Sequence, residues 1–224
     1  MRYLLVLLLC SCDAVERTEV QSWPADGPEG VIQALSIDLT VGDVTVRARP
    51  EAGGEIRATR HIHGPAGGVE VEEDRFGGTF AMRGACAVLA NCRVDLVVEV
   101  PAGTALSLRT GSGSVSLEGP LGDVRVDVGD GAVSGWVETE GELGVRVGWG
   151  DVELEDRAVP AALTVNVARG DVQLAVPGGA YDLRLDAFAG TETSGMVKSA
   201  EGPRIQAQTR SGRVEVRGLA ADRG

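Results

Sequence analysis

Apolar and polar residues alternate along much of the chain, in short stretches interrupted by a glycine. Residues 163–176, LTVNVARGDVQLAV, run apolar–polar–apolar to Gly-Asp-Val and then alternate again, and 144–156, GVRVGWGDVELED, do the same. Alternation of period two predicts a β-strand with one buried face. The glycine ends the strand at a corner, because it adopts backbone conformations that a Cβ disfavours. Each unit is therefore predicted to be a strand, a glycine corner and a second strand.

This unit recurs seven times, aligned by its corner glycine, and from Gly113 onward the intervals are 18 to 22 residues. The unit at Gly190 fits badly, because its later inward positions hold Glu192 and Ser194. The seven glycines are Gly42, Gly113, Gly131, Gly150, Gly170, Gly190 and Gly212. One unit is too small to bury its apolar face, whereas stacked units bury it continuously. The repeat predicts an all-β β-solenoid stacked in sequence order, with a β-sandwich or barrel as the alternative.

The repeat is confined to residues 31–219, which we interpret as one domain, followed by a tail at 220–224. Between 51 and 101 the pattern weakens, and longer hairpins that project from or continue the early coils are predicted there. Residues 13–30 lack periodicity and contain several Pro and Gly, so a flexible linker is predicted. Trp23 in this linker either packs on the first coil or belongs to a loose segment.

The composition supports an all-β chain, and the net charge argues against one class of partner, nucleic acid. Hydrophobic residues make up 43% and aromatic residues 4%, and 32 residues are glycine, so aliphatic side chains must build the core. The net charge of −12 repels polyanions. We therefore expect no nucleic-acid partner.

The first twelve residues, MRYLLVLLLCSC, predict export. A charged start and an apolar run of residues 3–9 are typical of a short signal peptide, and the run is too short to span a bilayer. Leu9-Cys10-Ser11-Cys12 resembles the bacterial lipobox, which implies lipidation of Cys12, a signal peptide at 1–12 and anchoring in a membrane. Cys10 fits less well, because the bulky Leu9 precedes it. Ordinary secretion and a chain that is not exported are the alternatives.

Two further cysteines, Cys86 and Cys92, flank a short loop between alternating stretches. A hairpin would bring them within disulfide distance, and export would let the bond form. Two reduced thiols or a metal-binding pair are the alternatives, although a pair without a nearby His or third Cys is a poor zinc site.

The segment 98–128, VEVPAGTALSLRTGSGSVSLEGPLGDVRVDV, resembles the adhesin-like β-strand-repeat domains of bacterial envelope proteins. The resemblance extends over roughly residues 31–218. It implies an all-β fold and a place in the cell envelope. That family has no catalytic residues to transfer.

Other candidate chemistry is weak. His61 and His63 would share one strand face, a spacing that can chelate Zn or Cu, but exposed histidines on either side of an inward Ile62 fit better. The repeated Gly-Asp pairs favour turns over calcium ligands, and 110–115 lacks the lysine of a phosphate-binding loop. We therefore expect no metal, cofactor or enzymatic activity.

The expected function is a lipid-anchored envelope module that binds a protein or glycan or serves a structural role; the alternative is a polysaccharide-binding or polysaccharide-acting β-helix protein.

Overall fold

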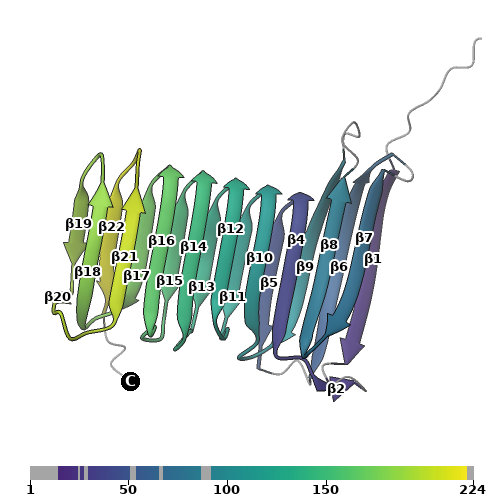
Figure 1. Cartoon of the computed structure of the whole chain (residues 1–224), viewed down its shortest axis with the longest axis horizontal. Coiled ribbons are helices and arrows are strands. Elements are labelled where there is room, and N and C mark those ends of the chain that lie inside the picture. The colour runs from purple at the N-terminus through teal and green to yellow at the C-terminus, as the bar shows by residue number, and fades with distance from the viewer. Residues whose placement is uncertain are drawn as a thin grey trace, which may run out of the picture.

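The computed structural model describes residues 15–24, 26–27, 30–50, 54–65, 68–86 and 92–220. This part of the chain contains strands and turns, and none of it forms a helix able to cross a membrane. Two ten-stranded sheets face each other as in a sandwich, and a short pair, β2 (Asp26–Gly27) and β3 (Gly30–Val31), lies apart from them (Figure 1). The all-β prediction is confirmed.

Both sheets mix parallel and antiparallel pairs. In spatial order, sheet 1 contains β1 (Val15–Pro24), β6 (Glu55–Gly64), β9 (Arg93–Pro101), β5 (Val44–Arg49), β11 (Val115–Gly119), β13 (Val133–Val137), β15 (Val152–Asp156), β17 (Val172–Pro177), β22 (Val214–Leu219) and β19 (Thr191–Ser194). Sheet 2 contains β20 (Val197–Lys198), β18 (Ala180–Ala187), β21 (Arg204–Thr209), β16 (Ala162–Arg169), β14 (Glu142–Trp149), β12 (Val124–Asp130), β10 (Ala105–Ser112), β4 (Ala34–Val41), β8 (Thr79–Cys86) and β7 (Val69–Phe76).

From β10 to β17 the chain alternates between the two sheets, and each strand up to β15 pairs in parallel with the equivalent strand one repeat later. Val145 of β14, for example, lies between Val126 of β12 and Val165 of β16. The inward side chains of both sheets are buried and form one continuous aliphatic core. The alignment of the repeats by their glycines therefore gives the register in which these strands pair.

The repeats were predicted to stack in sequence order, and the structure corrects this prediction for two of them. The last unit, β21–β22, inserts between β16–β17 and β18–β19, and β4–β5 inserts between β8–β9 and β10–β11. The badly fitting unit β18–β19 thus forms the end of the stack. This coil is offset by one residue from the predicted alignment: Thr191 and Thr193 pair with the inward Val214 and Val216, and Glu192 pairs with the outward Glu215. All of β19 is exposed, so a terminal position accommodates inward threonines that an internal coil would have to bury.

The other end of the stack is closed by strands from the segment in which hairpins and a linker were predicted. Residues 15–24 form β1, which pairs antiparallel with β6, so these residues correct the linker prediction. Trp23 of β1 packs against Phe80, with ring centroids 4.7 Å apart. The buried Arg60 guanidinium lies over the Trp23 ring and forms an ion pair with Glu73 of β7. This polar closure protects the core where no further coil covers it.

The corner glycines lie one above another. At Gly170 the φ angle is +137°, and a Cβ there would overlap the carbonyl oxygen of Gly150, one repeat earlier. Gly212 stands in the same relation to Gly170. Among the aligned glycines, positive φ angles are found at Gly42, Gly113, Gly131, Gly150, Gly170, Gly190 and Gly212. The corner requires glycine both for its backbone conformation and for the close approach of successive coils.

Candidate functional site

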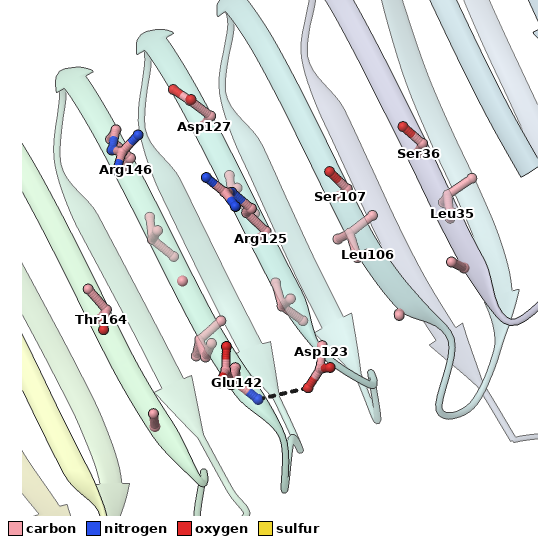
Figure 2. Close-up of a pocket in the computed structure, with 18 of the residues that line it drawn as sticks. Leu35, Ser36, Leu106, Ser107, Asp123, Arg125, Asp127, Glu142, Arg146 and Thr164 are labelled. Atoms are coloured by element: carbon pink, nitrogen blue, oxygen red, sulfur yellow. Dashed lines mark hydrogen bonds between the residues drawn. The ribbon is translucent and has the colours of Figure 1, made fainter. Parts of the chain in front are cut away.

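The outer face of sheet 2 carries a long trough. Two adjoining hollows, of about 610 Å³ and 890 Å³, share Asp127, Arg146 and Asn166 in their linings. Together they extend across the strands from the β4 side toward β18, and Figure 2 shows the first of them. Such a shape suits a ligand that lies across many strands.

The trough arises because small side chains occupy outward positions at matching heights on neighbouring strands. Ser36, Ser107, Gly144 and Thr164 occupy equivalent positions on β4, β10, β14 and β16, and Arg125 on β12 is the one large residue in this row. Gly129, Gly148 and Ala168 line the second hollow. Longer side chains stand beside these small residues and form the walls. Two exposed aromatic rings, Phe76 and Phe188, line the first and second hollow respectively.

A row of alternating charges, which we call the charge ladder, runs across the same face. Its members are Glu72, Arg83, Asp38, Arg109, Asp127 and Arg146, one on each of the adjacent strands β7, β8, β4, β10, β12 and β14. The row continues as the amides Asn166 on β16 and Gln208 on β21. Within the ladder, Arg109 and Asp127 form an ion pair of 3.6 Å. Arg83 and Arg146 form no ion pair or side-chain hydrogen bond with the other described residues.

Two carboxylates in the trough already have structural partners. Asp127 forms the ion pair with Arg109, and the Asp123 Oδ1 atom accepts a 2.9 Å hydrogen bond from the backbone N–H of Glu142, drawn in Figure 2. Arg125 lies one strand away from Arg146 and also has no hydrogen-bond or ionic partner among the described residues. The groups free to meet a ligand are therefore guanidinium and hydroxyl donors together with two further carboxylates, Glu142 in the first hollow and Asp186 in the second.

The aspartates of the Gly-Asp pairs stabilise the corners. The Asp151 Oδ1 atom accepts a 2.8 Å hydrogen bond from the backbone N–H of Asp171, and Asp171 accepts an equal bond from Arg213. Asp43 accepts one from Ser114 in the same way. Each carboxylate thus links one coil to the next, as expected for a turn role.

The remaining residues singled out by sequence lie far from the trough. His61 and His63 lie on the outer face of β6 in sheet 1, with Ile62 buried between them, and His61 Nδ1 is 3.1 Å from Thr18 Oγ1. A disulfide joins Cys86 to Cys92, whose Cα atoms are 5.8 Å apart. Cys12 and Cys10 lie outside the described residues. The trough itself was missed by the sequence analysis, although its charge ladder could have been found by aligning the outward positions of the repeats.

Asp156, at the end of β15, is a buried carboxylate that the repeat pattern did not reveal. It is 1% exposed, and its Oδ1 atom accepts hydrogen bonds of 3.1 Å from the backbone N–H groups of Thr139 and Ala158, while Oδ2 has no partner. Burial raises the pKa of Asp156 from 3.8 to about 6, with a smaller contribution from Glu138. The Asp156 charge in turn adds to the effect of burial in raising the pKa of Tyr181. The carboxylate therefore destabilises the fold in its charged form.

We expect acidification to increase the contribution of Asp156 to stability. Because its pKa is higher in the folded chain than its ordinary value of 3.8, the folded state binds the proton more tightly; the contribution is full below pH 3.8 and is lost as the pH rises through about 6. Urea unfolding of wild type and Asp156→Asn at pH 4.5 and 7.5 measures this contribution of Asp156 to the free energy of unfolding. The difference between the two proteins should change by about 2 kcal/mol between these pH values. Parallel pH profiles would contradict this assignment.

The fold is shared with a solved bacterial protein. A candidate cell adhesion protein from Clostridium sporogenes aligns with a TM-score of 0.55 at 11% identity, over 92% of this chain and 100% of that chain. A candidate adhesin from Bacteroides fragilis aligns with a TM-score of 0.38 at 12% identity, over 91% of this chain and 97% of its own, and one from Parabacteroides merdae with 0.35 at 12%, over the same shares. The sequence matches no family model and no curated protein. The likeness to the Clostridium protein shows a common all-β fold.

Proposed function

We propose that this chain is a non-enzymatic binding module of the bacterial envelope, and that the trough on sheet 2 is its binding surface. The observation that carries the proposal is the continuous hollow across the strands, lined by small residues and by guanidinium groups without partners. Asp123 and Asp127 are engaged in structural contacts, and the other two lining carboxylates, Glu142 and Asp186, lie in different hollows, so among the described residues no free pair of carboxylates shares one hollow, which favours binding over catalysis. The Clostridium protein of the same fold is described as a candidate for cell adhesion.

The architecture we propose is a two-sided β-solenoid. Parallel pairing of equivalent strands and the stacked corner glycines support it, because a sandwich of unrelated strands does not require either. Such stacks present long, regular faces, which suit extended ligands.

The place we propose for the module is the outside of a bacterial membrane, held by lipid on Cys12. The lipobox-like Leu9–Cys12 supports the anchor, and the Cys86–Cys92 disulfide supports an oxidising compartment. Palmitate should label the wild type and not Cys12→Ala.

Blocking the trough tests the binding function. Gly144 lies in its floor, and a Cβ there would meet its nearest atom, the Val124 carbonyl oxygen, at an ordinary 3.7 Å. Gly144→Phe should therefore fill the trough and leave the fold intact. The matched control is Ser116→Phe on the outer face of sheet 1.

The full chain, purified in detergent, is applied to arrayed bacterial and host surface polysaccharides and matrix proteins. We expect wild type and Ser116→Phe to bind the same arrayed ligand, and Gly144→Phe to lose at least about 90% of the signal, as expected when a well-packed contact surface is obstructed. Equal binding by Gly144→Phe would exclude the trough as the binding surface.

A further inference from the structure

The charge ladder indicates which ligand the outer face of sheet 2 accepts. We propose that this face binds an extended polysaccharide that carries a carboxylate on every second sugar residue and runs along the charge ladder, across the strands. The ligand enters the trough where Asp127, Arg146, Asn166 and Gln208 line it. This inference rests on the proposed binding function and makes it chemically specific.

The spacing of the cationic groups carries the argument. Arg83, Arg109 and Arg146 lie at one height on β8, β10 and β14, with a single strand between each pair. Neighbouring strands are about 4.8 Å apart, so the arginines repeat every ~9.6 Å. A pyranose residue in an extended β-linked chain is about as long as one strand spacing. Every second sugar of such a chain would therefore come opposite an arginine.

The groups between the arginines select against a uniformly charged chain. Asp38 and Asp127 occupy the intervening strands, so they accept hydrogen bonds from sugar hydroxyls and repel carboxylates. The net charge of −12 adds long-range repulsion of dense polyanions. The sites thus favour charged and neutral sugars in alternation.

The arginines are available for a ligand. Arg83 and Arg146 have no ionic partner among the described residues, and Arg109 is 69% exposed, so its 3.6 Å pair with Asp127 is a weak surface pair that a ligand carboxylate can replace. Figure 2 shows Arg125 and Arg146 on adjacent strands, and both residues are exposed. A guanidinium binds a carboxylate through two parallel hydrogen bonds, which gives an oriented contact.

The rest of the trough suits a sugar chain. Asn166 and Gln208 extend the ladder with amides that can donate to and accept from hydroxyl groups. The exposed ring of Phe188, which lines the second hollow beside Gln208, offers an apolar face to the C–H groups of a pyranose. The small residues Ser107, Gly144 and Thr164 allow the chain to approach the sheet closely.

Three polysaccharide probes test the proposal with the full chain in detergent, by biolayer interferometry at fixed ionic strength. The first is a hyaluronan fragment, in which glucuronate alternates with a neutral amino sugar. The second is the same fragment with its carboxyl groups reduced to hydroxymethyl groups, and the third is polymannuronate, with a carboxylate on every residue. We expect the first to bind roughly tenfold or more tightly than the other two. Binding of the reduced fragment as tight as that of the native fragment would overturn the proposal.

Variants of the ladder locate the interaction. The double variant Arg109→Gln, Arg146→Gln should lose hyaluronan binding by about tenfold or more, whereas Arg217→Gln, an exposed guanidinium on sheet 1, should leave it unchanged. The double variant Asp38→Asn, Asp127→Asn should bind polymannuronate several-fold better and so reduce the discrimination. Unchanged hyaluronan binding in the arginine variant would refute the ladder as its site.

The outcomes separate this inference from the binding function itself. If none of the three probes binds, but an arrayed ligand binds wild type and not Gly144→Phe, the alternating polysaccharide is wrong and the trough remains the binding surface. If hyaluronan binds Gly144→Phe as well as wild type, both proposals fail.

Discussion

Val167→Asp is expected to destabilise the fold by about 3 to 5 kcal/mol, because it places a carboxylate without a partner in the core. Val167 is 2% exposed in β16 and lies between Val147 of β14 and Thr209 of β21. Its sequence neighbour Asn166 points to the outer face, so Asn166→Asp should cost less than about 0.5 kcal/mol. Urea unfolding of both variants measures the difference. Equal losses would contradict the alternation of inward and outward residues.

Hydrogen exchange on Val167→Asp tests the order of the stack. Because each coil contacts only its neighbours, protection should be lost first in β14 and β21 and later in β18, although β18 is nearer than β21 in sequence. Early loss at residues 35–46 would show that damage does not spread through adjacent coils.

The repeated units could be predicted from sequence because each unit contains both the alternating apolar residues and the corner glycine. In the unit 163–176, the inward Val165 and Val172 and the corner Gly170 each have an equivalent in the preceding unit, and the same side chains are buried in the structure. Period two fixes which side chains face inward, and the glycine fixes where the chain turns. Local pattern and tertiary packing agree in these coils.

The order of the coils could not be read in the same way. The units carry very similar inward aliphatic residues, so sequence alone does not show which unit lies next to which. Strand β16 would form similar aliphatic contacts with β18 as it does with β21. The deciding feature is the polar inner row of β19, which is tolerated only at an end. The strand at residues 15–24 was not predicted because apolar and polar residues alternate only weakly in a strand at the edge of a sheet, where most side chains are in solvent.

The candidate site was hidden for a related reason. Outward residues such as Arg109, Asp127 and Arg146 look like ordinary surface charges within each unit. Their alternation appears only between units, at right angles to the chain, once the register places them side by side. A property spread over six strands leaves no motif in any one segment.

Gly170→Ala is the second substitution with a large expected effect, about 3 kcal/mol or more. The new Cβ would have to adopt a φ of +137° and would also overlap the Gly150 carbonyl oxygen, so backbone strain and a steric clash add. The two clashing coils can relieve the overlap only by separating, which breaks the N–H···O=C bonds between them, such as that from Gly150 N–H to the Arg169 carbonyl at 2.9 Å.

The variant Gly190→Ala separates the effect of backbone strain from that of the steric clash. Gly190 has a φ of +108°, but a Cβ there would meet no atom within 4 Å, because the end coil is offset by one residue and places Ala189, not Gly190, beside Gly212. Its substitution should therefore cost only the backbone strain, about 1 to 2 kcal/mol. Urea unfolding of both variants at one pH gives the comparison. If the two alanine variants lose equal stability, the close contact between stacked glycines contributes nothing, and conformation alone explains the glycine at every corner.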